Sequence, residues 1–235
     1  MSDEPPKRRM VRPPTGGGPA RAKSERLKSG KQRTASSRAW LERQLADPFV
    51  AEARARGWRS RAAFKLIEID DRFRLIRPGV RVLDLGCAPG GWLQVATARG
   101  AAAVVGVDLL ATEPVARATI FEGDFTDPQV QARLLEALGG PPDLILSDMA
   151  PNTVGHRQTD HLRIMALIEA ATDFALTALK PGGAFLTKAF QGGETAEVTV
   201  RLKPAFAEVR HVKPKASRAE SSELYLLAKG FQRNA

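Results

Sequence analysis

The sequence has little with which to cross-link itself or to cross a membrane. Cys87 is the one cysteine in 235 residues, so an internal disulfide is excluded and a reducing, cytoplasmic compartment is expected. No uninterrupted apolar run approaches the roughly 20 residues of a membrane-spanning helix. The charged N-terminus also lacks the apolar core of a secretion signal. The sequence therefore predicts neither a membrane protein nor a secreted one.

Histidine is also scarce. His156, His161 and His211 have no metal-ligand spacing with the cysteine, so no metal site is expected. Cys87 has no histidine near it in the sequence that could activate a thiol nucleophile, and we expect it to be a small packing residue.

Positive charge is concentrated at the N-terminus. Residues 1–40 hold 11 Lys or Arg and 3 Asp or Glu, which is +8 of the chain's net +10. This segment is rich in Pro, Gly and Ser and has few large apolar side chains, so it cannot offset its ordering entropy by burial. We predict a disordered basic tail over 1–38 and one domain over 39–235. The tail is either an electrostatic arm for nucleic acid, which we favour, or a solubilising segment.

The rest of the chain alternates between strand and helix patterns, which predicts a parallel sheet covered on both faces. A helix is expected from Ser60, with an apolar stripe, ending before Pro78. Two further apolar segments, 207–214 and 222–230, are joined by a loop too short for a crossover helix and predict a terminal antiparallel hairpin. The expected strands are 81–86, 103–108, 118–122, 143–148 and 184–190, and the expected helices between them are 91–99, 128–138 and 160–179.

A glycine turn follows the first strand. In "VLDLGCAPGGW", Gly86 permits a sharp turn, and Gly90 and Gly91 allow the backbone to approach a ligand closely. The following helix directs its N-terminal amides into the same crevice. The spacing matches neither the dinucleotide-binding fingerprint nor the P-loop, so a different nucleotide-like cofactor is indicated.

Aspartates stand at or near the ends of three successive strands. Asp108 is placed to accept hydrogen bonds from ribose hydroxyls, Asp124 to accept from an adenine amino group, and Asp84 to meet a cationic amino group. An ammonium, a ribose and an adenine together suggest S-adenosylmethionine. The alternative for each aspartate taken alone is that it caps a loop.

Five segments, in this order, resemble the FtsJ/RrmJ-like methyltransferases: "DLGCAPGGW", "GVDLL", "GDF", "SDMAPN" and "KAFQG". These are bacterial enzymes that 2′-O-methylate a uridine in 23S ribosomal RNA, and the resemblance runs from about Gly57 to Lys229. It implies an α/β, Rossmann-like, seven-stranded S-adenosylmethionine-dependent fold whose last strand is antiparallel. It also implies that Trp92 and Asp148 lie at the cofactor site.

Two charged residues interrupt apolar strands at their ligand-binding ends, Asp148 after "LILS" and Lys188 in "GAFLTKAF". The resemblance implies a Lys-Asp-Lys-Glu catalytic tetrad, matched here by Lys65, Asp148, Lys188 and Glu223. We expect Lys188 to be the base or the group that positions the 2′-hydroxyl, and Asp148 to orient it. Lys65 and Glu223 would tune charge and hold the ribose. Taken alone, Lys65 could be a solvated helix residue and Glu223 a strand-end charge.

The function expected from this resemblance is 2′-O-methylation of a uridine in the 23S RNA of the large ribosomal subunit, or of a late precursor, by a monomeric enzyme. A tRNA or another RNA as substrate, or a ribosome-assembly factor that acts mainly by binding, are the alternatives. Two basic clusters flank the tetrad and are expected to contact RNA. They are Arg54, Arg56, Arg59 and Arg61, and then Lys213, Lys215 and Arg218.

We predict that deleting residues 1–37 weakens affinity for RNA and flattens its dependence on salt, because cations on phosphates release counterions. Affinity for S-adenosylmethionine should be unchanged. Binding titrations at several salt concentrations test this, and an unchanged salt slope would contradict the arm.

Overall fold

The computed structural model describes residues 47–150, 155–218 and 221–232. The predicted tail over 1–38, and its boundary with the domain, lie outside these residues. Within the part described, no helix is both long enough and apolar enough to cross a membrane.

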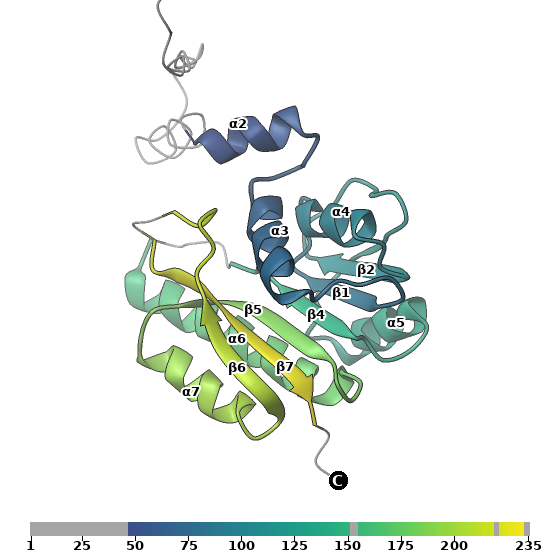
Figure 1. The fold of residues 1–235 in the computed structure, drawn as a ribbon. Coiled ribbons are helices and arrows are strands. Elements are labelled where there is room, and N and C mark those ends of the chain that lie inside the picture. Colours follow the sequence, from purple (N-terminus) through teal and green to yellow (C-terminus); the bar gives the residue numbers. More distant parts are fainter. Residues whose placement is uncertain (1–46, 151–154, 219–220, 233–235) are drawn as a thin grey trace, which may run out of the picture. The chain divides into compact units, whose positions relative to one another are not determined.

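A seven-stranded sheet forms the centre of the domain, with the strand order β3-β2-β1-β4-β5-β7-β6 (Figure 1). The first five strands are parallel, and β7 is inserted antiparallel between β5 and β6. The predicted α/β class and terminal antiparallel hairpin are therefore confirmed. The strands are β1 (Arg81–Leu85), β2 (Ala103–Asp108), β3 (Thr119–Glu122), β4 (Leu144–Ser147), β5 (Ala184–Phe190), β6 (Phe206–Val212) and β7 (Glu223–Phe231).

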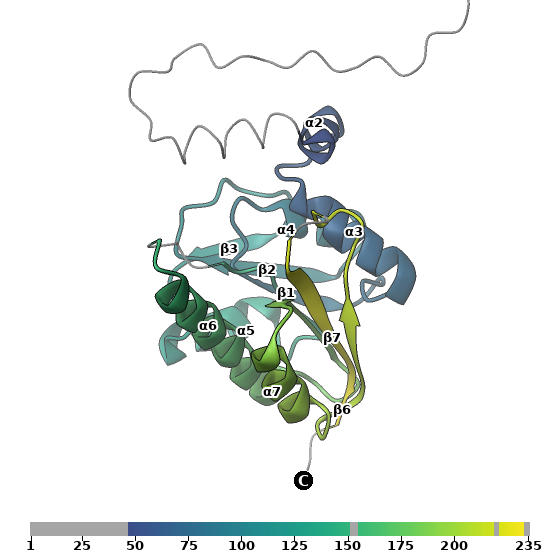
Figure 2. The same cartoon turned by 90° about the vertical axis from the view of Figure 1, so that its left-hand side faces the viewer.

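Helices cover both faces of the sheet (Figures 1 and 2). One face carries α3 and α4, and the opposite face carries α5, α6 and α7. The short helix α2 packs on the outer side of α3. Their bounds are α2 (Pro48–Ala55), α3 (Ala62–Phe73), α4 (Gly91–Ala98), α5 (Pro128–Leu138), α6 (Arg157–Ala178) and α7 (Gly193–Leu202).

Alternation along β1 divides the core in two. Leu83 and Leu85 join the apolar cluster under α5, α6 and α7, while Val82 joins the cluster under α3 and α4. Asp84 alternates with these leucines, so its carboxyl group lies on the α3–α4 face of the sheet. A strand buried on both faces thus carries a buried charged residue two positions before Gly86, where the glycine turn begins.

The helix predicted to begin at Ser60 and to end before Pro78 is shorter in the structure. It begins at Ala62 and ends at Phe73, because Arg74 takes a left-handed conformation with φ of 54°. The Asp70 carboxylate then accepts a hydrogen bond from the amide of Ile76 at 2.7 Å. The Asp70 side chain thus replaces the backbone carbonyl that the Ile76 amide would meet in a longer helix. The apolar stripe in the sequence does not show this early end.

The other predicted strands, and the helices 91–99, 128–138 and 160–179, are observed to within a few residues. Helix α7 was missed. Its sequence begins with a glycine, follows another at the N-cap and contains several β-branched residues, all of which have low helix propensity. It forms because Val198 and Leu202 pack into the core under the sheet, so tertiary burial overrides local preference.

We predict that Gly106→Ala destabilises the fold by about 1–3 kcal/mol, as overpacking does. A Cβ at Gly106, in the middle of β2, would lie 2.9 Å from the Cβ and Sγ atoms of Cys87 and 3.0 Å from Leu93. The free energy of unfolding in urea measures the effect. Gly123→Ala is the matched control, because a Cβ there meets Val130 no closer than 3.4 Å. Equal effects of the two changes would contradict this packing argument.

Candidate active site

The register of three neighbouring strands gathers charged side chains at one edge of the sheet. Ser147 of β4 pairs with Thr187 of β5, so the next residues, Asp148 and Lys188, follow side by side. Lys188 also pairs directly with Tyr225 of β7. The carboxyl end of β4 and one face of the antiparallel β5–β7 pair therefore meet at these three residues.

All four members of the predicted tetrad come together there. Lys188 Nζ lies 2.9 Å from Asp148 Oδ1 and also donates to the backbone oxygen of Asp148 at 2.9 Å. Lys65 Nζ lies 2.7 Å from Glu223 Oε1 and 3.9 Å from Asp148 Oδ2. Their side chains are 9–16% exposed, so the four charges form a nearly buried cluster with two cations and two anions.

Lys65 reaches this cluster from α3, across the face of the sheet. Its neighbours Leu66 and Ile69 are buried in the core, which fixes the helix against β1, β4 and β7. A lysine on a helix is usually solvated, but here the ammonium is desolvated and paired. Burial is the observation that separates Lys65 from an ordinary surface lysine.

Tyr225 is a fifth member of the cluster, and the sequence analysis missed it. Its hydroxyl donates to Asp148 Oδ1 at 2.7 Å and accepts from Lys65 Nζ at 3.1 Å. The residue is fully buried. A signal was present in the sequence, since Tyr225 is the one tyrosine of the chain and stands two positions after Glu223, hence on the same face of a strand.

Electrostatics fix the protonation of two of these groups. Burial alone would raise the pKa of Asp148, but the charges of Lys188 and Lys65 and the hydrogen bonds from Lys188 and Tyr225 hold it below its ordinary value. Burial, followed by the charges of Asp148 and Glu223, raises the pKa of Tyr225 well above its ordinary value. Asp148 is therefore an anion at neutral pH, and Tyr225 is a neutral donor.

The glycine turn adjoins this cluster. Leu85 of β1 pairs with Ser147 of β4, so Gly86 and Asp148 begin neighbouring loops at the same edge. Gly86 has φ of 78°, and a Cβ there would lie 2.2 Å from Cγ of Met149. Gly90 caps α4 with φ of 100°. Positive φ favours glycine at both positions, so the tight turn depends on these two residues.

Asp84 lies beneath this turn with both carboxylate oxygens buried and without a hydrogen-bond partner in the part of the chain that the structure describes. Burial raises its pKa well above the ordinary value, and the negative charges of Asp148 and Asp108 raise it further. A buried carboxyl group without a partner is costly. It is suited to a cationic ligand that enters the crevice.

Asp108 and Asp124 both cap loops in the structure. Asp108 accepts from the amides of Ala88 and Leu110, each at 2.9 Å. Asp124 accepts from the amide and the hydroxyl of Thr126, at 2.9 and 2.7 Å. The loop-capping interpretation therefore holds for both, and their binding of ribose or adenine stays a prediction.

Gly91 and Trp92 open helix α4. A Cβ at Gly91 would meet Ser60 Oγ at 2.5 Å, so the glycine permits close packing of the segment before α3. Trp92 is buried, donates from Nε1 to the carbonyl of Ala62 at 2.8 Å and packs at 5.8 Å from the ring of Tyr225. Trp92 of α4 thus contacts both the start of α3 and Tyr225 of the charge cluster. Contact of Gly91 or Trp92 with a cofactor stays a prediction.

Cys87 in the same turn is buried, and burial, with the nearby charges of Asp84 and Asp108, raises its thiol pKa to about 12. It is thus protonated at neutral pH, which agrees with the expected packing role. Among the described residues, no group of three or more His, Cys, Asp or Glu side chains could hold a metal ion.

Three of the basic residues expected to contact RNA also form contacts between separate segments of the protein. Arg59 donates to the carbonyls of Pro89, Glu113 and Pro114. Arg61 lies 2.8 Å from Asp47, which Arg218 also approaches at 3.4 Å. The other four, Arg54, Arg56, Lys213 and Lys215, have exposed side chains.

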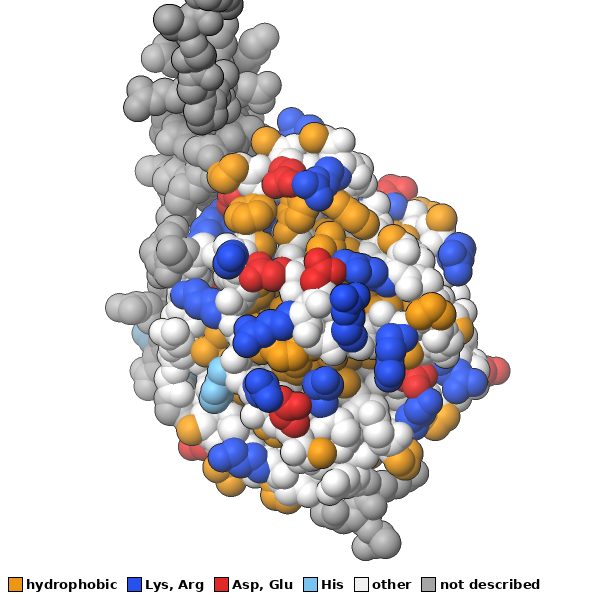
Figure 3. All heavy atoms as spheres, viewed as in Figure 1, with side chains coloured by type: hydrophobic (Ala, Val, Ile, Leu, Met, Phe, Trp, Pro, Cys, Tyr) orange, Lys and Arg blue, Asp and Glu red, His pale blue; other side chains and the backbone are white. Residues whose placement is uncertain are grey.

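Over the face formed by α3 and β6, Figure 3 shows Lys and Arg side chains interspersed with acidic ones. Contact of the four exposed basic residues with RNA stays a prediction.

Comparison with known proteins identifies the class: the chain is a methyltransferase. More particularly, residues 58–231 match the family described as FtsJ-like methyltransferase, so the chain belongs to that family.

Its relatives are similar over nearly the whole length. The chain is 63% identical over 224 residues to Ribosomal RNA large subunit methyltransferase E of Caulobacter sp. (strain K31), covering 95% of this chain and 99% of that protein. It is 60% identical over 213 residues to the protein of the same name in Gluconobacter oxydans (strain 621H), covering 91% and 80%. A solved Plasmodium falciparum structure described as a ribosomal RNA methyltransferase has a TM-score of 0.67 and 31% identity, covering 74% of this chain and 98% of that one.

We predict that Asp84→Asn stabilises the ligand-free protein increasingly as pH rises. The pKa of Asp84 is raised on folding, so its contribution to stability is present below the pKa of the unfolded chain and is lost as pH rises through the folded pKa. Asparagine does not ionise, so the variant does not lose stability in this way as pH rises. The difference in unfolding free energy between variant and wild type, measured in urea from pH 5 to 9, should widen with pH.

Asp143→Asn, followed from neutral pH down into the acid range below its ordinary pKa, is the control with the opposite sign. Burial alone would raise the pKa of Asp143, but hydrogen bonds from Lys180 and the amide of Arg81 lower it. Its contribution to stability is therefore present above the unfolded pKa and is lost as pH falls through the folded pKa. A pH-independent difference for Asp84→Asn would contradict the assigned burial of an unpaired carboxyl group.

Proposed function

We propose that this methyltransferase transfers a methyl group from S-adenosylmethionine to the 2′-hydroxyl of a uridine in the 23S RNA of the large ribosomal subunit. The observation that carries the proposal is the buried cluster of Lys65, Asp148, Lys188 and Glu223 at the edge of the glycine turn. The names of the similar bacterial proteins support the large-subunit substrate.

The residues around the turn fit S-adenosylmethionine. Its methionine part carries an ammonium, and Asp84 offers a buried carboxylate without a partner among the described residues. Gly86 and Gly90 have no side chains, so a ligand can come close to the backbone there. Asp108 ends strand β2 at the same edge of the sheet. When bound, this cofactor supplies an electrophilic methyl group on a sulfonium. Residues Asp84, Gly86, Gly90, Gly91, Trp92, Asp108, Asp124 and Asp148 are proposed to hold it.

Lys188 is proposed to hold the target hydroxyl and to take its proton. A neutral amine has two N–H donors and one lone pair. Lys188 is paired with Asp148 as an ammonium, and in this proposal it releases one proton to solvent before the transfer. Asp148 accepts at both its carboxylate and its backbone oxygen, each 2.9 Å from Nζ, so both N–H groups of the resulting amine have partners. The remaining lone pair is then free to accept the hydroxyl hydrogen as the methyl group is transferred.

The other cluster members fix this arrangement. The same oxygen of Asp148, Oδ1, accepts from Lys188 Nζ and from the Tyr225 hydroxyl, and these two contacts orient the plane of the carboxylate. Lys65 lies between Asp148 and Glu223 and balances their charges. In this proposal Lys65 and Glu223 lie where the ribose enters, while Asp148 faces the methyl-sulfonium end of the cofactor.

The chain is proposed to work as a monomer in the cytoplasm, where large subunits or their late precursors are available. The single cysteine supports a reducing compartment.

The test is transfer of tritiated methyl from S-adenosylmethionine to large subunits that lack the modification, followed by mapping of the labelled nucleotide. We expect label on one uridine ribose with the wild type. Lys188→Ala should lower the rate by about 100-fold or more, because it removes the proton acceptor. Asp84→Asn should raise the Kd for the cofactor while leaving RNA affinity unchanged.

Lys203→Ala is the control, because Lys203 is exposed just after α7, away from the cluster. Label on tRNA but not on subunits would keep the chemistry and overturn the substrate. Cofactor binding without transfer to any RNA would overturn the enzymatic proposal in favour of an assembly factor that acts by binding.

A further inference from the structure

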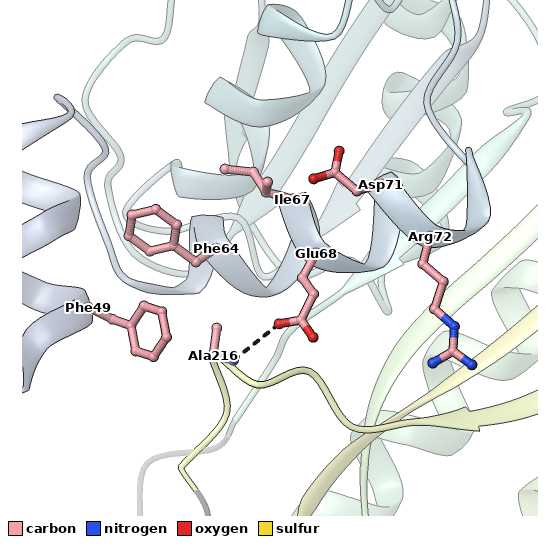
Figure 4. A pocket seen from close by; sticks show the side chains of 7 residues that line it. All are labelled: Phe49, Phe64, Ile67, Glu68, Asp71, Arg72 and Ala216. Atoms are coloured by element: carbon pink, nitrogen blue, oxygen red, sulfur yellow. Dashed lines mark hydrogen bonds between the residues drawn. The ribbon is translucent and has the colours of Figure 1, made fainter.

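The loop between β6 and β7 is attached to the helix that carries Lys65. The Glu68 carboxylate of α3 accepts the amide of Lys215 at 2.9 Å and the amide of Ala216 at 3.3 Å. Arg61, just before α3, donates to the carbonyl of Ala216. Figure 4 shows Ala216 beside Glu68, with Phe49 and Phe64 close by. Three polar contacts and an apolar cluster therefore hold this short segment against α3.

The next residue of the same loop faces the catalytic cluster. Ser217 is 6% exposed, its amide closes a turn onto the carbonyl of Pro214 at 3.0 Å, and its hydroxyl donates to Glu223 Oε1 at 2.9 Å. The same oxygen, Oε1, lies 2.7 Å from Lys65 Nζ. One carboxylate oxygen of Glu223 thus receives a serine hydroxyl and a lysine ammonium together.

These contacts close a ring that begins and ends on α3. Lys65 binds Glu223, Glu223 binds Ser217, and the two residues before Ser217 bind Glu68, one helical turn after Lys65. A glutamate at the start of a strand has several rotatable bonds, and a single ion pair leaves much of that freedom. A second, charge-assisted bond to the same oxygen removes it.

We propose that Ser217 is a positioning residue of the reaction: it fixes the Glu223 carboxylate on Lys65, and the Glu68-bound loop holds it there. The inference rests on the proposed function of the tetrad and adds a residue outside it. Ser217 touches neither reacting atom in this proposal. It acts through Glu223, so its loss should change the rate of the bound complex and not the affinity for either substrate.

The test compares Ser217→Ala, Ser217→Thr and Ser222→Ala in the methyl-transfer assay with large subunits. Ser217→Ala should lower kcat by about tenfold, with KM for the cofactor and for subunits unchanged. Ser217→Thr keeps the hydroxyl and should restore most of kcat. Ser222 is an exposed serine of the same loop, so its substitution should leave kcat unchanged.

A second variant separates positioning from loss of structure. Glu68→Gln weakens the attachment of the loop from the far side of the ring, and should lower kcat in the same direction with a smaller effect. If Ser217→Ala instead raises KM for subunits together with a lower melting temperature, the residue merely holds a loop that carries basic side chains, and the inference is wrong.

Failure of this inference is distinguishable from failure of the proposed function. Wild-type activity that is lost in Lys188→Ala and kept in Ser217→Ala would overturn the role of Ser217 alone. A wild type that transfers no methyl group to any RNA would overturn the proposed function and, with it, this role.

Discussion

The structure depends on one constraint: the charged groups at the carboxyl edge of the sheet are nearly buried and must satisfy one another. The Asp148 carboxylate pairs with Lys188 and accepts a hydrogen bond from Tyr225, while Lys65 lies within ion-pair distance of both Asp148 and Glu223. Removing a partner from such a cluster leaves a buried charge without compensation, which costs about 3–5 kcal/mol. The residue after β4, the strands β5 and β7 and helix α3 each supply at least one member, so the cluster couples the geometry of the proposed active site to the stability of the sheet.

The antiparallel strand β7 is what completes this cluster. A parallel last strand would reach the proposed active site with its carboxyl end, whereas β7 begins there and runs back between β5 and β6. Its first residue, Glu223, and its third, Tyr225, share a face, and direct pairing of Tyr225 with Lys188 places a neutral donor beside Asp148. The β6–β7 loop is hydrogen-bonded to α3, because the Glu68 carboxylate accepts from the amides of Lys215 and Ala216. The position of β7 in the sheet therefore determines the geometry of the charge cluster.

The glycine-turn side of the proposed site follows a different principle, because its buried aspartate has no hydrogen-bond partner among the described residues. Asp84 is buried beneath the turn with both oxygens unpaired among the described residues, beside two other carboxylates that raise its pKa. Such a site stores unfavourable free energy in the ligand-free protein, and a cationic ligand relieves it. Asp108 differs, since it caps the turn and the following loop through two amides. At the same edge, Asp108 is therefore hydrogen-bonded to the loops, whereas Asp84 has no hydrogen-bond partner among the described residues.

The sequence by itself determined the alternation of strands and helices, the glycine turn, and the resemblance that points to the four tetrad residues, because strand and turn patterns are local and the motifs are contiguous. Only the tertiary structure decided which charges are buried and what they touch. Tyr225 and Ser217 join the cluster through strand pairing and through a loop bound to α3, and Arg59 and Arg61 turn inward to carbonyls and to Asp47. Helix α7 forms against its local propensity because its apolar face is buried. Partners distant in the chain set each of these outcomes, and the spacing of Tyr225 from Glu223 is the one local signal among them.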